Sequence, residues 1–83
     1  MSHVVRSPEQ LGTLIRRARR QRGMTQANLA GLTGLRQELV SRIETGHEGT
    51  KLSSIYALFA ALNLELIVDD RNAKAAKDIE DIF

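Results

Sequence analysis

The chain has 83 residues, a net charge of +2 and no cysteine. A chain of this length forms at most one domain and buries a limited fraction of its surface, which favours help from a partner subunit, and without cysteine neither disulfides nor thiolate chemistry holds the fold. The longest apolar run, residues 64–68, contains Glu65 and is too short to cross a bilayer, and no signal peptide is recognisable. We therefore expect a cytoplasmic protein with no membrane contact.

The first helix is predicted to begin at Pro8. Ser7 provides an N-cap, Pro8 suits the first helical position, and Gln10 can reach back in a capping box. The following apolar stripe consists of Leu11, Leu14, Ile15 and Ala18. Arginines crowd residues 16–22, and for Arg16, Arg17 and Arg20 a solvated helix face and a nucleic-acid or membrane contact remain open alternatives.

Residues 23–46 predict two short helices joined by a tight turn. Thr25 can cap a helix that begins at Gln26, and residues 31–34 contain two glycines that break it. A second helix over residues 36–45 places Val40 and Ile43 one turn apart on its inner face. Its outward face is short and polar. This spacing is typical of a helix-turn-helix unit, whose second helix enters the major groove of DNA.

Two charged residues lie where apolar side chains are expected. Arg19 falls on the flank of the first apolar stripe, and Glu44 follows Ile43 on the same face as Val40. A charge at such a position needs a partner to offset its desolvation. We therefore predict that Arg19 and Glu44 form a partly buried ion pair that links the first helix to the second helix of the helix-turn-helix unit and fixes their orientation.

The segment from Gly12 to about Leu64 resembles the Cro/C1 (XRE) family of helix-turn-helix proteins. The matching residues are Arg19, Gly23, Thr25, Gln26, Leu29, Ala30, Gly34, Val40, Ser41, Ile43, Glu44 and Gly46. The resemblance implies an all-α bundle of about five helices and supports the Arg19–Glu44 pair. It also implies that Gln26 touches a DNA phosphate and that Gln37 reads a base. Arg36 stands where the family usually has a small capping residue.

The expected DNA-binding residues cluster on the second helix of this unit and at the start of the first. They are Gln26, Arg36, Gln37, Glu38, Ser41, Arg42 and Thr45. Gln37 is expected to prefer adenine, because an amide pairs bidentately with N6 and N7, and Glu38 can accept from the amino group of cytosine.

A last helix is expected after Gly49, with Thr50 as its cap and a core-facing stripe that includes Leu52, Ile55, Tyr56, Phe59 and Leu62. Residues 64–69 then read as a β-strand, for which only Val4 and Val5 offer a weak partner within the chain. An unpaired apolar strand is a template for an identical strand of a second chain. We therefore expect a two-fold homodimer whose shared sheet is formed by Leu64, Leu66, Ile67 and Val68.

The segments at the two ends of the domain point to one class within this family. The entry SPEQL, the closing LNLELIVD and a short charged tail are similar to the HipB class of bacterial antitoxins. That class implies a dimeric repressor that binds palindromic operators of its own operon and holds a HipA-type serine/threonine kinase toxin. Residues 1–63 carry nine basic and four acidic residues, whereas residues 64–83 carry three and six. The acidic tail ends in three large apolar residues that are predicted to bind the toxin, Ile79, Ile82 and Phe83.

The expected organisation is an arm over residues 1–6, a DNA-binding domain over 7–63, a dimerisation strand over 64–70 and a flexible tail over 71–83. No cluster of residues has metal-ligand or catalytic spacing, and His3 and His47 are isolated, so neither an enzyme nor a cofactor is predicted. Double-stranded DNA, a second copy and a kinase toxin are the expected partners. Two alternatives to an antitoxin stay open: a stand-alone repressor without a toxin, and an interaction module that has lost DNA binding.

Overall fold

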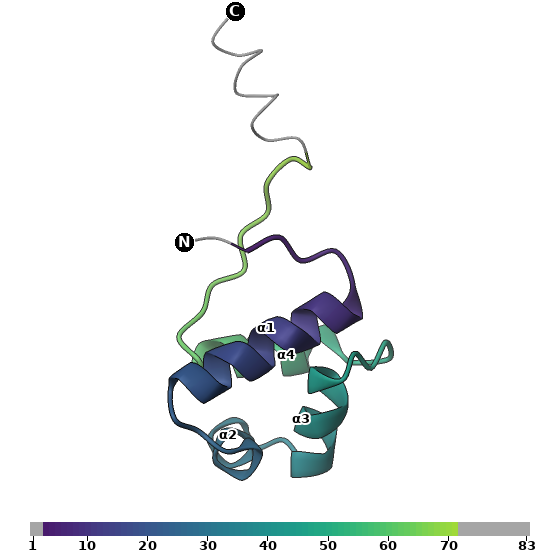
Figure 1. Cartoon of the computed structure of the whole chain (residues 1–83). Helices are drawn as coiled ribbons and strands as arrows, with labels where there is room; N and C mark the ends of the chain where they lie inside the picture. The colour runs from purple at the N-terminus through teal and green to yellow at the C-terminus, as the bar shows by residue number, and fades with distance from the viewer. Residues whose placement is uncertain (1–2, 72–83) are drawn as a thin grey trace, which may run out of the picture.

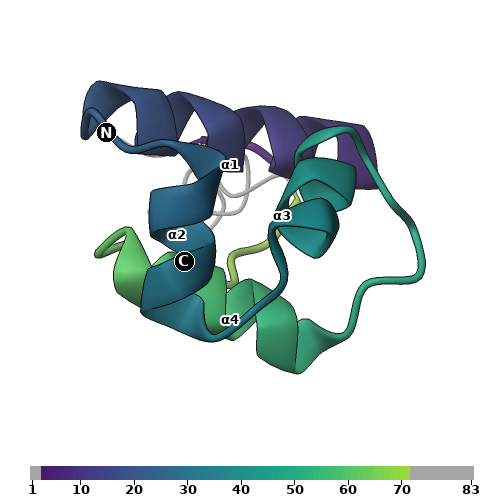
Figure 2. The ribbon, with the colours of Figure 1, turned by 90° about the horizontal axis from the view of Figure 1, so that it is seen from below.

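The computed structural model describes residues 3–71, and these form four helices. They are α1 (Pro8–Gln21), α2 (Gln26–Thr33), α3 (Gln37–Glu44) and α4 (Leu52–Ala61). Figure 1 shows α1 lying across the body with α2 and α3 below it, and Figure 2 shows α4 closing the bundle beside α2. The all-α prediction is confirmed for the described residues, although a fifth helix is not among them. None of the four helices is long and apolar enough to cross a membrane.

The starts of α1 and α2 follow from their capping residues. The Ser7 hydroxyl accepts from the backbone N–H of Gln10 at 3.1 Å. The Gln10 side chain, however, accepts from the N–H of Arg6 and not from that of the cap residue, so the predicted box is displaced by one position. At α2 the box is complete, because Thr25 and Asn28 each accept from the backbone N–H of the other.

The end of α2 and the start of α4 differ from the prediction. The helix α2 continues through Gly31 to Thr33 and stops at Gly34, which has a φ of 74°. That left-handed conformation is readily available only to glycine, so Gly34 alone ends the helix. Likewise, α4 is capped by Lys51 without a side-chain hydrogen bond, and the predicted cap, Thr50, instead donates its hydroxyl to the carbonyl of His47 at 3.3 Å.

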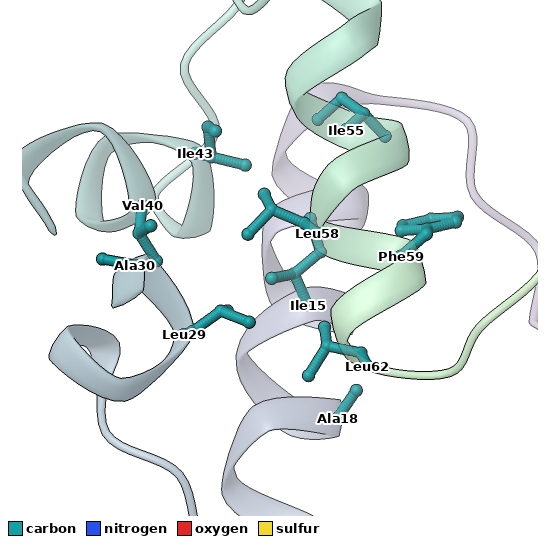
Figure 3. Packing of buried hydrophobic residues seen from close by; sticks show 10 residues of the cluster. All are labelled: Ile15, Ala18, Leu29, Ala30, Val40, Ile43, Ile55, Leu58, Phe59 and Leu62. Atoms are coloured by element: carbon teal, nitrogen blue, oxygen red, sulfur yellow. The ribbon is translucent and has the colours of Figure 1, made fainter. Parts of the chain in front are cut away.

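The hydrophobic core lies between all four helices, and Figure 3 shows its side chains converging from each of them. The buried residues are Ile15, Ala18, Leu29, Ala30, Val40, Ile43, Ile55, Leu58, Phe59 and Leu62. Two residues of the expected α4 stripe are not part of it, because Leu52 is 60% and Tyr56 51% exposed. Leu58, which the predicted stripe omitted, is fully buried instead.

At Gly12 the backbone of α1 lies directly against the end of α3. A Cβ atom built on this glycine would lie 2.6 Å from the carbonyl oxygen of Glu44. No ordinary side chain fits at that distance, so the missing side chain lets the two backbones touch. The contact brings the last turn of α3 against α1 and so fixes how α3 is presented.

Residues 64–70 have no regular secondary structure in this single chain. The side chains of Leu66, Ile67 and Val68 are 50%, 76% and 92% exposed. In Figure 1 this segment leaves the helical body on the side opposite α2. The predicted strand is therefore not formed within the described residues of one chain, although its apolar residues are exposed as a dimerisation segment requires.

Candidate nucleic-acid interface

An open hollow lies over the start of α2 and the exposed face of α3. Its lining residues are Gln26, Arg36, Gln37, Glu38, Ser41 and Arg42. These are six of the seven residues predicted from the sequence to bind DNA. Four of them are exposed and two, Gln26 and Ser41, are half-buried. The surface therefore offers donors and acceptors to a ligand at little desolvation cost.

The seventh predicted residue, Thr45, lies at the opposite end of α3. Its hydroxyl donates to the carbonyl oxygens of Ser41 and Arg42, at 3.2 and 2.9 Å. Thr45 caps the helix through its backbone and does not line the hollow. The structure therefore brings six of the predicted residues together and separates Thr45 from them.

The start of α3 is left without a side-chain cap. Arg36 occupies the N-cap position and makes no capping hydrogen bond, as expected from an arginine where a small polar residue is usual. The first backbone N–H groups of α3 are consequently not covered by a side-chain acceptor. Together with the positive end of the helix dipole, they favour an anion near the hollow.

The predicted pair of Arg19 and Glu44 is present. Arg19 donates from Nε to Oε2 of Glu44 at 2.7 Å and from Nη2 to Oε1 at 3.0 Å. Its remaining terminal nitrogen donates to the carbonyl oxygen of Met24 at 2.8 Å. The Glu44 side chain has no exposed surface, and that of Arg19 is 10% exposed. One buried bidentate contact therefore ties α1, the turn before α2, and the end of α3 together.

Two further residues gather around the same carboxylate. Gln26 donates from Nε2 to Oε1 of Glu44 at 3.1 Å, and Nε of Arg16 lies 3.6 Å from that oxygen. Neither contact was predicted from the sequence. The signal was present for Arg16, because it precedes Arg19 by three residues and so shares its helix face. No local pattern pointed from Gln26 to Glu44, since 18 residues separate them.

The surroundings keep Glu44 charged. Burial alone raises the pKa of a carboxyl group, but hydrogen bonds from Arg19 and Gln26 and the positive charges of Arg19 and Arg16 outweigh it, so the pKa of Glu44 lies below its ordinary value. The hydrogen bond to Glu44 likewise raises the pKa of Arg19, against the effect of its own burial. Both partners are therefore ionised across the physiological range.

The remaining predicted site residues divide into two groups. Leu64 is half-buried against the core, whereas Leu66, Ile67 and Val68 are exposed. The apolar tail residues Ile79, Ile82 and Phe83 lie outside the described residues. His3 and His47 are both exposed, and residues 3–71 contain no group of three or more histidine, cysteine or acidic residues able to hold a metal ion.

Comparisons with known proteins identify the family of this chain. The helix-turn-helix family HTH_3 matches residues 15–68. The antitoxin HipB of Escherichia coli K12 is 32% identical over 68 residues, which cover 81% of this chain and 77% of the relative. This chain belongs to the HipB-type helix-turn-helix family.

Solved structures of HipB superimpose closely on the described fold. A HipB–O4 20mer complex matches with a TM-score of 0.80 and 28% identity, covering 86% of this chain and 100% of the other. A HipA–HipB–O2–O3 complex matches with the same values. The likeness thus extends over the helix-turn-helix unit and most of the segments on either side of it.

Proposed function

We propose that this protein is a sequence-specific DNA-binding repressor and the antitoxin of a toxin–antitoxin pair. The observation that carries the proposal is the hollow over α2 and α3, where six predicted DNA-binding residues meet on one open surface. The exposed face of α3 lies in the major groove, and the buried Arg19–Glu44 pair holds this helix at a fixed angle to α1.

The polar residues of the hollow divide into phosphate and base contacts. Gln37 and Glu38 stand in the first turn of α3, which in this motif reaches the base edges. Gln37 pairs with adenine, and Arg36 and Arg42 add positive charge on either side. Gln26 lies at the start of α2, with its amide held by Glu44, and contacts a phosphate.

A homodimer fits this function because operators of such repressors are two-fold symmetric. Residues 64–69 of two chains pair as strands in a shared sheet, which covers the exposed Leu66, Ile67 and Val68. The segment leaves the body on the side opposite α2, so pairing there keeps both hollows open to DNA (Figure 1). Two copies of α3 then reach two half-sites of one palindrome.

The toxin partner is a HipA-type serine/threonine kinase. Support comes from the relative solved as a HipA–HipB–O2–O3 complex, which matches 86% of this chain. We place part of the contact in the tail, where Ile79, Ile82 and Phe83 can bury apolar area that the neighbouring charged residues cannot. Deleting Ile82 and Phe83 is expected to weaken toxin binding in a calorimetric titration and to leave DNA binding by the free dimer unchanged.

The DNA-binding part is tested by replacing Gln37. The Gln37→Ala variant is expected to bind the duplex from its own promoter region with an affinity reduced by about 1 to 3 kcal/mol and to bind a random duplex as before. Fluorescence anisotropy measures both. Gln21→Ala is a matched control, because Gln21 is also an exposed helix residue but lies at the end of α1, outside the hollow. Equal losses on both duplexes would show that Gln37 reads no base.

A further inference from the structure

The buried carboxylate of Glu44 is surrounded by more positive charge than it can neutralise. Arg19 and Arg16 both lie within 4 Å of it, yet Glu44 supplies a single negative charge. Arg19 is fully engaged, because its three nitrogens donate to Glu44 and to the carbonyl of Met24. The charge of Arg16 is therefore the one left without a counterion at this cluster.

Arg16 lies beside the Glu44 carboxylate but forms no hydrogen bond through its Nε. Its Nε is buried, 3.6 Å from Oε1 of Glu44, and makes no hydrogen bond. The side chain as a whole is nevertheless 42% exposed, so the exposed area belongs to the parts other than Nε. At 3.6 Å the contact with Glu44 is too long for a hydrogen bond, and the carboxylate already accepts three hydrogen bonds from other groups.

The position of Arg16 connects it to the DNA-binding hollow. The oxygen of Glu44 nearest to Arg16 is also the oxygen that accepts from Gln26, and Gln26 lines the hollow. The side chains of Arg16 and Gln26 therefore lie on either side of the buried Glu44 carboxylate, at the edge of the hollow. A guanidinium has five N–H donors in a planar fork that suits a phosphate, so several remain available to a ligand.

We propose that Arg16 is a phosphate-binding residue that acts beside Gln26, with the carboxylate of Glu44 positioning both side chains. The inference rests on the proposed function and adds to it a contact from α1, outside the helix-turn-helix unit. It also decides between the alternatives that the arginine run leaves open: Arg16 binds nucleic acid, whereas its neighbour Arg17 belongs to a different surface. Arg17 lines a separate hollow with Val4, Val5 and Leu14.

The test compares Arg16→Ala with Arg17→Ala in the full-length chain. Each variant loses one arginine from α1, but only the first removes the group beside Glu44. Binding to the promoter duplex and to a random duplex is measured between about 50 and 200 mM salt, because each phosphate contact contributes about 0.9 to the slope of log K against log salt concentration. Arg16→Ala is expected to reduce the slope by about 1.8 in a dimer, equally on both duplexes.

Thermal unfolding separates a phosphate contact from a structural role. Arg16→Gln, which removes the charge and keeps a polar side chain, is expected to show the same slope change with a Tm close to that of the parent protein. Arg16→Lys is expected to recover most of the slope but not all of the affinity, since an ammonium group cannot bind bidentately. Equal slopes for Arg16→Ala and Arg17→Ala would overturn the proposal, as would a loss of Tm in the Arg16 variants without any change in slope.

Failure of the inference is distinguishable from failure of the proposed function. If the parent protein binds neither duplex, the DNA-binding function and the role of Arg16 both fall. If it binds, and Gln37→Ala lowers affinity for the promoter duplex alone while Arg16→Ala behaves like Arg17→Ala, only the role of Arg16 is wrong.

Discussion

Removing the carboxylate of Glu44 is expected to destabilise the protein strongly. In Glu44→Ala the guanidinium of Arg19 stays buried and keeps only its bond to Met24. Gln26 also loses its acceptor, so three hydrogen bonds to one ionised group disappear. Breaking a buried pair from one side typically costs about 3 to 5 kcal/mol, since an uncompensated charge remains.

This loss is large compared with the whole stability of the fold. At about 0.05 to 0.15 kcal/mol per residue, an 83-residue domain has about 4 to 12 kcal/mol in total. Urea denaturation followed by circular dichroism measures the change, at one fixed protein concentration because a dimer is stabilised by mass action. We expect a much lower denaturation midpoint for Glu44→Ala, with an unchanged m-value.

The double variant Arg19→Met with Glu44→Leu shows whether the charge or the packing is responsible. Apolar side chains of similar size often replace a buried pair at little cost or with a gain. The double variant is therefore expected to be more stable than Glu44→Ala. If Glu44→Ala alone costs less than about 1 kcal/mol, the pair behaves like an exposed surface ion pair, and the claim that it orients α3 is wrong.

Three other changes test separate parts of the structure. Gly12→Ala is expected to cost about 1 to 3 kcal/mol in the same denaturation assay, because its Cβ meets the α3 backbone, whereas the control Gly31→Ala, with open space around it, is expected to cost nothing or to stabilise. Because folding lowers the pKa of Glu44 from 4.5, the ionised carboxylate stabilises the fold fully above that pH, and this stabilisation is lost as the pH falls through the lower folded-state pKa. Glu44→Gln is therefore expected to reduce the loss of stability at acidic pH. An unchanged loss in this variant would assign the acid dependence to other carboxyl groups. Leu66→Pro removes a backbone donor and is expected to weaken dimerisation; sedimentation showing a full dimer at micromolar concentration would place the interface elsewhere.

Local signals predicted most of the fold correctly, because most of it is determined locally. Ser7 and Thr25 cap the two helices that they were expected to cap, and Gly34 ends α2. The errors also have local causes. Lys51 caps α4 without a side-chain hydrogen bond, so no residue type marks that start, and Thr50 one position earlier is the more conspicuous candidate.

Six of the seven residues predicted to bind DNA line one hollow, but the contacts that support this surface were predicted only in part. The Arg19–Glu44 ion pair could be predicted because a charged residue on an apolar helix face is unusual, and these two residues have opposite charges. Gln26 gave no such signal, since a glutamine at the start of a helix is ordinary in itself. Its contact with Glu44 depends on the angle between α2 and α3, which the hydrophobic pattern alone does not specify.

The structure of residues 64–69 could not be predicted from one chain alone. Their alternating and β-branched residues favour a strand, but a strand needs a neighbour to accept and donate its backbone hydrogen bonds. The helices of the body bond internally and offer no edge, and Val4 and Val5 remain exposed without a backbone hydrogen bond to this segment in the described residues. Within residues 3–71 the segment has no strand partner, and Ile67 and Val68 remain 76% and 92% exposed, so we expect it to pair with the same segment of a second chain.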